Sequence, residues 1–389
     1  MRAVILLLMT AIFLEAGVLV FDKNSSLEKY AEDILANCSS VTRRQSCYDV
    51  EIPKLLGRIS MEGAFGVTRL IQEKDSGYFY CHVLGHNISA KETSKDPDKW
   101  KDVVARCPSN LCSNGCIHGA FQERFRAEAL PDAAIEELKP ELLGVCEKRP
   151  GWNPTDMERA TCYHALGHLT MYMTDANIHK STALCEEITQ DASSQRFTPI
   201  CFDGAFMQIF QPLEPEDFAL IEGKQPTREE LPSFCKDFEG NRKGSCWNEG
   251  WPLFQEKITT PEGVVEFCST LKELDLQHRC YNAMFYVVPT QFQLDENRIQ
   301  KFCSGLPDPQ RGKCFANAAS RFIETDASLV ANSARMCEYA ASFGAEEECY
   351  RELLFYSTYN FHEGSEDFLR MCSALPQAWE NKCLAKETF

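Results

Sequence analysis

The sequence predicts an all-α fold: an α-solenoid of about ten disulfide-stapled two-helix repeats with a period near 34 residues. Two observations predict it. Cysteines recur at a nearly constant interval, and apolar residues recur at the three- and four-residue steps of a packed helix face. The composition agrees with a folded globular body, because 44% of the residues are hydrophobic and 25% are charged.

One series of cysteines opens an apolar run in each unit, which we interpret as the start of the unit's second helix. Its members are Cys47, Cys81, Cys116, Cys162, Cys201, Cys246, Cys280, Cys314, Cys349 and Cys383, at intervals of 34, 35, 46, 39, 45, 34, 34, 35 and 34 residues. A second series closes the first helix of a unit: Cys38, Cys107, Cys146, Cys185, Cys235, Cys268, Cys303, Cys337 and Cys372. Intervals near 34 residues are typical of helical hairpin repeats.

The twenty cysteines are an even set, which predicts a disulfide framework outside the reducing cytosol. We predict the pairs Cys81–Cys112 and Cys107–Cys116, and we expect the other cysteines to pair in order along the chain. Each such pair staples the end of one helix to the start of the next. In the chain-entropy model, closing a loop of about ten residues contributes roughly 2–3 kcal/mol. Zinc ligation by cysteine is disfavoured, since no C-x2-C pair occurs.

The C-terminal units show the repeat most clearly. The segment 295–303 is apolar-periodic, a Gly/Pro-containing loop follows it, and a second helix with Phe315, Ala318 and Phe322 on one face starts at Cys314. In repeat length and architecture alone, the sequence resembles the tetratricopeptide and Sel1-like class of α-solenoids. The Trp/Leu/Gly/Tyr/Pro pattern of the tetratricopeptide unit is missing, so the resemblance implies no functional residue.

We expect three regions along the chain: a signal anchor or signal peptide at 1–22, an N-terminal solenoid with duplicated His-rich repeats at 23–210, and a C-terminal solenoid of regular Cys-paired repeats at 211–389. Three long intervals hold loop-like inserts at 147–162, 188–201 and 211–232. Inserts in a solenoid gather on one face, which is often the binding face. The inserts therefore place a functional surface in the first two thirds of the chain.

The N-terminus carries an export signal. Residues 3–21 are mostly apolar, are preceded by Arg2 and are interrupted by Glu15. Leu14 fits poorly at the outer position of the best cleavage site, which favours an uncleaved membrane anchor. The body then lies outside the cytoplasm, in a periplasmic, extracellular or secretory-lumen location, and is secreted if the segment is cleaved. The net charge of −17 argues against a nucleic acid partner.

Five of the eight histidines fall in a duplicated pattern. HVLGH at 82–86 matches HALGH at 164–168, and CIHGAF at 116–121 matches CFDGAF at 201–206. The copies are 82 and 85 residues apart, and Asp203 stands in the second copy where His118 stands in the first. Two consecutive units were therefore duplicated together.

The duplicated residues form two candidate metal sites. Histidines four residues apart share a helix face and can chelate one ion, while a neighbouring helix about 8–10 Å away supplies a third ligand. The predicted sets are His82, His86 and His118, and His164, His168 and Asp203. If the two sets face each other, a dinuclear centre is an alternative. Such sets suit zinc, iron, copper or manganese, and haem held by two histidines stays an alternative. Glu123 and Glu249 are candidates for a base or an extra ligand.

Glycines flank the candidate ligands at 85, 119, 167 and 204. A glycine inside a helix costs about 1 kcal/mol relative to alanine, so four at matching positions indicate a purpose. One purpose is close helix packing. The other is clearance for a metal ion or a substrate.

Two functional hypotheses follow. The first is a membrane-anchored, extracytoplasmic, disulfide-rich repeat protein with a His-based transition-metal site for metal binding, sensing or metal-dependent chemistry. The second is a non-catalytic scaffold for protein partners on the cell surface, in which the histidines are structural. The sequence leans against an enzyme and identifies no catalytic residue. If the protein is an enzyme, we expect a metal-dependent hydrolase or oxidoreductase.

Overall fold

The computed structural model describes residues 26–75, 77–78, 80–108, 111–112, 115–125 and 129–385. Over these residues the protein is predominantly helical and contains no β-strand, as the sequence predicts. The expected anchor at 3–21 lies outside the described residues. Among the helices that are described, none has the length and apolar character needed to span a bilayer.

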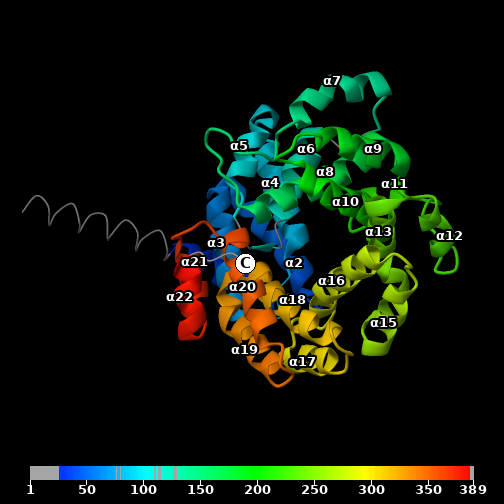
Figure 1. The fold of residues 1–389 in the computed structure, drawn as a ribbon. Coiled ribbons are helices and arrows are strands. Elements are labelled where there is room, and N and C mark those ends of the chain that lie inside the picture. Colours follow the sequence, from blue (N-terminus) through cyan, green and yellow to red (C-terminus); the bar gives the residue numbers. More distant parts are fainter. Residues whose placement is uncertain are drawn as a thin grey trace, which may run out of the picture.

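The second helices of the units form a continuous inner layer. Each of them packs against the next one along the chain, and Figure 1 shows the layer curving into a ring. These helices are α4 (His82–Thr93), α6 (Gly115–Phe125), α8 (Asp156–Met173), α10 (Thr198–Phe210), α13 (Gly240–Glu249), α16 (Leu274–Gln291), α18 (Gln310–Thr325) and α20 (Glu346–Asn360).

The first helices of the units lie on the outside of this ring (Figure 1). They are α5 (Trp100–Ala105), α7 (Asp132–Leu142), α9 (Ile178–Ile188), α12 (Leu231–Lys236), α15 (Pro261–Ser269), α17 (Glu296–Ser304) and α19 (Val330–Ala341). Short helices complete the chain: α11 (Pro215–Leu220), α14 (Gln255–Ile258), and the 3-10 turns η1 (Ile52–Gly57), η2 (Pro97–Lys99), η4 (Gln195–Phe197), η5 (Trp251–Phe254) and η6 (Ala327–Leu329).

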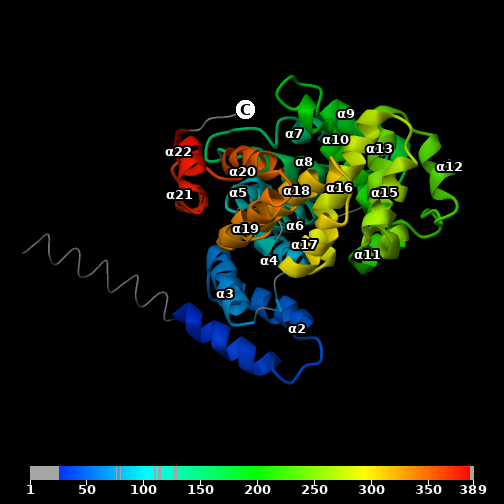
Figure 2. The ribbon, with the colours of Figure 1, turned by 60° about the horizontal axis from the view of Figure 1, so that its bottom comes forward.

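Both ends of the chain add helices to the ring. A helix at 26–38, α2 (Arg44–Glu51) and α3 (Met61–Lys74) precede it, and Figure 2 shows them projecting from one side. At the other end, α21 (Glu366–Ser373) and α22 (Gln377–Ala385) follow α20.

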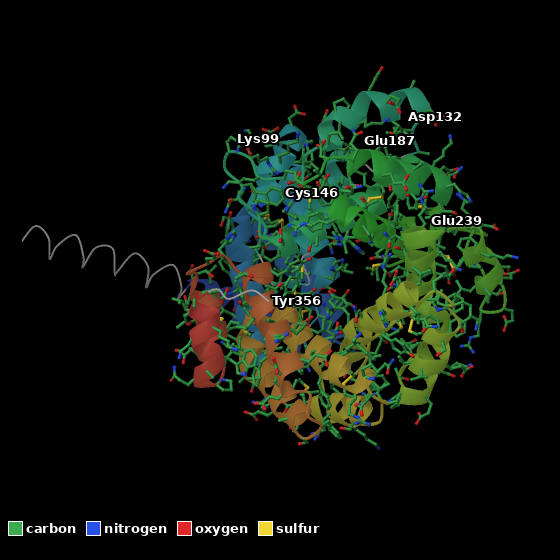
Figure 3. All side chains as sticks on the ribbon, in the orientation of Figure 1. Lys99, Asp132, Cys146, Glu187, Glu239 and Tyr356 are labelled. Atoms are coloured by element: carbon green, nitrogen blue, oxygen red, sulfur yellow. A yellow bond between two sulfur atoms is a disulfide. The ribbon has the colours of Figure 1, made fainter. Side chains whose placement is uncertain are left out.

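Ten disulfides join the helices, with the connectivity that the cysteine spacing predicts, and Figure 3 shows them as yellow bonds. No cysteine is free. A framework of this density is typical of an oxidising, extracytoplasmic compartment.

One detail of the prediction is wrong, because the second cysteine of several pairs lies inside its helix and does not start it. Cys162 lies well inside α8, which begins at a capping box formed by Thr155 and Glu158. Cys280 and Cys314 likewise lie inside their helices. The turns before these cysteines carry polar, partly exposed residues, so the apolar run begins later than the helix does.

The ring closes on itself. Helix α20 contacts α8, although the two helices are nearly two hundred residues apart in the chain. Tyr359 of α20 packs against the hydrophobic cluster of the N-terminal units, and the His362 Nε2 atom lies 3.6 Å from Glu158 Oε2. The C-terminal repeats therefore support the units that carry the histidines.

Candidate metal centre

The structure brings five histidines into one cluster. His82 and His86 lie on α4, His118 on α6, and His164 and His168 on α8. The His118 ring is in the middle: its centroid is 5.0, 5.2, 5.6 and 5.3 Å from those of His82, His86, His164 and His168. The sequence predicts the two histidine groups and leaves open a dinuclear centre in which they face each other. The structure places the two groups around His118.

Close packing of helix pairs α4–α6 and α8–α10 brings the rings together. The four duplicated glycines, Gly85, Gly119, Gly167 and Gly204, lie at these two contacts. A Cβ atom on Gly119 would lie 2.2 Å from the His86 carbonyl oxygen, and one on Gly204 would lie 2.0 Å from that of His164. Neither distance is physically possible. The glycines therefore serve close approach of the backbones.

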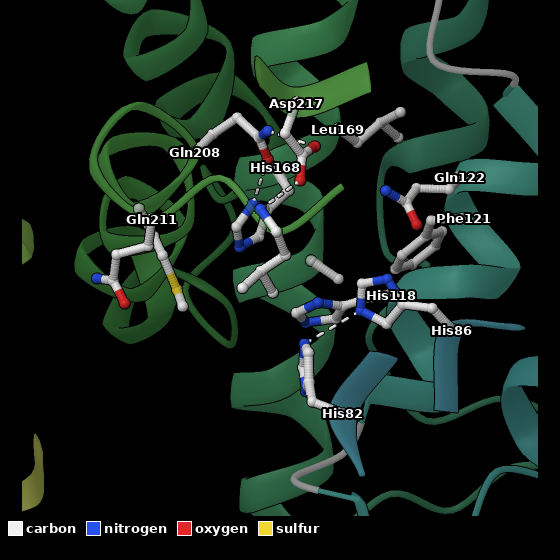
Figure 4. Close-up of a pocket in the computed structure, with 13 residues that line it drawn as sticks. His82, His86, His118, Phe121, Gln122, His168, Leu169, Gln208, Gln211 and Asp217 are labelled. Carbon is white, nitrogen blue, oxygen red and sulfur yellow. Dashed lines mark hydrogen bonds between the residues drawn. The ribbon is translucent and has the colours of Figure 1, made fainter. Parts of the chain in front are cut away.

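His82, His86 and His118 form the first half of the cluster. Each offers a ligand atom, and these atoms lie within 4.8 Å of one another. The three side chains are 7–8% exposed. The Nε2 atoms of His82 and His86 are 3.1 Å apart, and Figure 4 shows them facing each other. The buried His118 Nε2 atom has no hydrogen-bond partner.

His164 and His168 form the second half. Their Nε2 atoms are 3.2 Å apart, and the Met207 Sδ atom lies 3.3 Å from the Nε2 atom of His164. The His168 Nδ1 atom is 2.6 Å from Gln208 Oε1. The Gln208 amide group donates in turn to Asp217 Oδ1 at 2.6 Å. Since the amide nitrogen faces the carboxylate, the amide oxygen accepts the proton on His168 Nδ1.

Asp217 is held in place by several donors. The backbone N–H groups of Leu213 and Glu214 both donate to its Oδ2 atom at 2.9 Å, and the Tyr172 hydroxyl donates to its Oδ1 atom. Burial raises the pKa of Asp217, but these hydrogen bonds outweigh burial and hold the pKa below its usual value. The carboxylate therefore stays ionised beside the cluster.

The same insert approaches the first histidine set. Glu214 lies at the N-terminal end of α11, and its Oε1 atom is 3.4 Å from His86 Nδ1. The insert at 211–232 thus places a carboxylate near each half of the cluster. The sequence predicts that inserts mark the functional face, and this insert does lie against the histidines.

Burial keeps the imidazoles of His118, His164 and His168 neutral. It lowers the pKa of His118 well below the usual range, and the neighbouring histidines lower it further. It lowers the pKa of His164 to about 3, with a further contribution from His168. It also lowers the pKa of His168, although Gln208 and Asp217 oppose the shift. Neutral imidazoles keep the nitrogen lone pairs that a metal ion needs.

Asp203 does not join the histidines, contrary to the expectation that it completes the second set. Its Oδ1 atom forms an ion pair with Arg279 Nη2 at 2.5 Å, on the side of α10 that faces α13 and α16. Burial raises the pKa of Asp203 and the Arg279 charge opposes this. Within the described ranges, the group of His82, His86 and His118 is the one set of His, Cys, Asp or Glu residues spaced for a metal ion.

The two predicted bases also lie away from the cluster. Glu249 is half-buried near Asp203, and its Oε2 atom accepts a hydrogen bond from Gln211 at 2.8 Å. Burial, then the Asp203 charge, raises the pKa of Glu249 well above its usual value. Glu123 is half-buried on α6, and it does not line the pocket beside the histidines, whereas Gln122 does.

A pocket with about 460 Å³ of empty space, part of it open to solvent, borders the cluster. Figure 4 shows His82, His86 and His118 on one side of it and His168 with Gln208 and Asp217 on the other. Met207 and Gln211 also line it. Sequence reasoning missed Met207, Gln208 and Asp217. Two features of the sequence could have indicated them. The second copy differs from the first at residues 207–208, and an acidic insert follows these residues.

Comparison of this chain with known protein families, with curated proteins and with solved structures gives no match.

Proposed function

We propose that the protein binds a transition-metal ion through His82, His86 and His118. One observation carries the proposal: three buried imidazoles converge, and the Nε2 atom of the central one is buried without a hydrogen-bond partner. A buried polar atom left unpaired costs about 1–3 kcal/mol. A metal ion at this position would take up the unused lone pair.

The ligand chemistry limits the ion. Neutral imidazole suits zinc, copper, iron and nickel, whereas calcium and magnesium prefer oxygen ligands. Thiolate ligands are absent, since every cysteine belongs to a disulfide. The Glu214 Oε1 atom lies 3.4 Å from His86 Nδ1 without a hydrogen bond to it, so a small rotation would make this carboxylate the outer partner of a ligating histidine. We therefore expect a divalent borderline ion or copper at this site.

A purely structural role for the histidines explains less. The His82 and His86 pair can share one proton in a hydrogen bond at 3.1 Å. The His118 ring would still lie among four others with its Nε2 atom unpaired. A structural cluster of this size would also bury several polar rings with little compensation.

The test is metal binding by the full-length protein, produced in an oxidising compartment without a polyhistidine tag. The protein is stripped with a chelator, reloaded with Zn(II), desalted and measured by elemental analysis. We expect the wild type to retain zinc and His82→Ala to lose most of it. His278→Ala, which removes an exposed histidine away from the cluster, is the matched control and should retain zinc. Equal zinc retention by the wild type and His82→Ala would refute the proposal.

We further propose that residues 3–21 anchor this metal-binding body to a membrane from the extracytoplasmic side. The apolar run and the disulfide framework support this location. Membrane fractionation, with mass spectrometry of the mature N-terminus, distinguishes an anchor from a cleaved signal. Release of the protein by high salt alone would contradict anchoring.

A further inference from the structure

We propose that His164, His168 and Met207 form a second metal subsite, selective for Cu(I). The inference rests on the proposed function, because it treats the histidine cluster as a metal centre, and it adds a second ion with a different ligand set. In this subsite the Met207 thioether is the third ligand, in the role that the sequence predicts for the Asp203 carboxylate.

Two of the three donor–donor distances match the spacing of ligands to one ion. The His164 Nε2 atom is 3.2 Å from His168 Nε2 and 3.3 Å from Met207 Sδ. Metal–nitrogen bonds of about 2.0 Å and metal–sulfur bonds of about 2.3 Å place such atoms about 3.3–3.7 Å apart. Only small rotations of the side chains would separate the observed positions from a bound geometry.

Hydrogen bonds from outside the subsite hold the ring protons of His164 and His168 on Nδ1. The Nε2 lone pairs therefore face the centre of the subsite. Gln208 accepts the proton on His168 Nδ1, so the Nε2 atom of this neutral ring is unprotonated. The Ile200 backbone accepts a hydrogen bond from the His164 ring. Because His164 Nε2 faces His168 and Met207, we assign this bond to Nδ1.

With both protons on Nδ1, three electron-pair donors meet without a proton between them. Two imidazole nitrogen lone pairs at 3.2 Å repel each other unless a cation lies between them. A thioether sulfur is only a weak acceptor and donates no proton, so Met207 cannot relieve the repulsion. The arrangement is therefore better suited to a metal ion than to an empty hydrogen-bonded pair.

The duplication explains why sequence matching points to the wrong residue. His118 on α6 aligns with Asp203 on α10, but Asp203 pairs with Arg279. Met207 lies one turn further along α10, at the position that Gln122 holds in the first copy. The third donor of the second copy has thus moved along its helix by one turn.

The two imidazoles and the thioether favour Cu(I), which is a soft ion. Thioether and imidazole ligands favour Cu(I), while zinc prefers four ligands from nitrogen, thiolate and oxygen. Since all twenty cysteines form disulfides, Met207 is the sulfur donor that lies at the cluster. Methionine also packs favourably against aromatic rings, which is the competing explanation of this contact. A structural test of the metal–sulfur bond separates the two.

The test is X-ray absorption of the full-length protein loaded with Cu(I) under anaerobic conditions. We expect the wild type to bind two copper ions and to show a sulfur neighbour at about 2.3 Å. Met207→Leu should bind one copper ion and show nitrogen neighbours only. Met284→Leu, a buried methionine on α16, is the matched control and should keep the sulfur signal. His82→Ala should also keep it, since this change removes a ligand of the first subsite.

The outcomes distinguish this inference from the proposed function. A wild type that binds copper or zinc through nitrogen alone overturns the second subsite and leaves metal binding by His82, His86 and His118 in place. A sulfur signal that persists in Met207→Leu also overturns it. A wild type that retains neither Cu(I) nor Zn(II) overturns both proposals. Measuring each variant by circular dichroism and urea unfolding confirms that any lost metal does not reflect lost folding.

Discussion

At Gly119 the backbone of α6 lies very close to that of α4. A Cβ atom there would meet the His86 carbonyl oxygen at 2.2 Å and the Ser89 hydroxyl at 2.5 Å. We predict that Gly119→Ala lowers the free energy of unfolding by about 1–3 kcal/mol or more, because the two helices must separate. Separation also moves His118 away from His82 and His86, so zinc retention should fall. Urea unfolding and elemental analysis measure the two effects.

Gly57 provides the control for this prediction. It is exposed, and a Cβ atom there would meet nothing within 4 Å. Gly57→Ala should change the free energy of unfolding by less than about 1 kcal/mol, and it should leave zinc retention unchanged. Equal effects of the two substitutions would contradict the role assigned to close helix packing.

Gln208 connects a ligand ring to an ionised carboxylate. It accepts from His168 Nδ1 and donates to Asp217 Oδ1, each at 2.6 Å. We predict that Gln208→Leu weakens copper binding at the second subsite by about 10–100-fold, since outer hydrogen bonds fix the tautomer and orientation of a ligand. Gln211→Leu, which loses a hydrogen bond to Glu249 and none to a histidine, should change the affinity little. Competition with a Cu(I) chelator measures both.

The lowered pKa values of three histidines in the cluster predict that the protein loses stability in mild acid. The pKa values of His118, His164 and His168 are lowered in the folded state, that of His164 to about 3, so the unfolded chain binds more protons below about pH 6.5. The metal-free protein should therefore have its full histidine contribution above pH 6.5 and lose it as the pH falls. His164 alone should account for about 2 kcal/mol between pH 7 and pH 5.

Urea unfolding of the metal-free protein at pH 7 and pH 5 tests this. Ion pairs such as Glu62–Arg106 do not contribute to the change between pH 7 and pH 5, because the hydrogen bond from Arg106 lowers the pKa of Glu62 to about 2. That pair loses its contribution only as the pH falls below about 4.5. His278→Ala should show the same pH dependence as the wild type, whereas His164→Leu should show a weaker one. Equal pH dependence of the wild type and His164→Leu would contradict the neutral, desolvated state assigned to the His164 ring.

At the scale of elements, the cysteine and apolar periodicities predict the helical hairpins and the disulfide connectivity, because both depend on local spacing. The starts of α8, α16 and α18 were not predictable from the apolar runs, since their first turns are polar and partly exposed. The ligand environment was less predictable still. Asp203 aligns with His118, but Arg279 from a helix two units away captures it, and a contact of this kind depends on tertiary packing.

The Cys81–Cys112 disulfide fixes the start of α4 next to His82. It closes a span of 31 residues, compared with 11 for Cys372–Cys383 near the end of the chain. In the chain-entropy model the longer loop contributes about 3.7 kcal/mol and the shorter one about 2.8 kcal/mol. We predict that Cys81→Ala/Cys112→Ala destabilises the protein more than Cys372→Ala/Cys383→Ala does.

The two disulfide variants should also differ in metal binding. Loss of the Cys81–Cys112 bond frees the segment that positions His82, so zinc affinity should drop, while the C-terminal variant should bind zinc like the wild type. Urea unfolding and zinc titration at equal protein concentration measure both properties. Equal zinc affinity of the two variants would contradict a positioning role for the Cys81–Cys112 bond.

At the scale of the whole molecule, closure of the ring is a property that repeat spacing does not predict. A repeat array in which each unit contacts its neighbours transmits local changes only to those neighbours. Here α20 also contacts α8, the helix that carries His164 and His168. The curvature that brings these helices together results from small rotations summed over many units, and such rotations leave no pattern in the sequence.

Ring closure predicts an effect at long sequence distance. Tyr359 packs against the N-terminal hydrophobic cluster, so Tyr359→Ala should loosen the start of α8 by about 1–2 kcal/mol, which is a 5- to 30-fold faster amide exchange. Hydrogen–deuterium exchange of the peptide 156–166 measures this. Leu369→Ala, an exposed position on α21, is the control and should leave that peptide unchanged. If Tyr359→Ala speeds exchange only within the C-terminal repeats, the molecule behaves as an open solenoid and α20 does not support the histidine cluster.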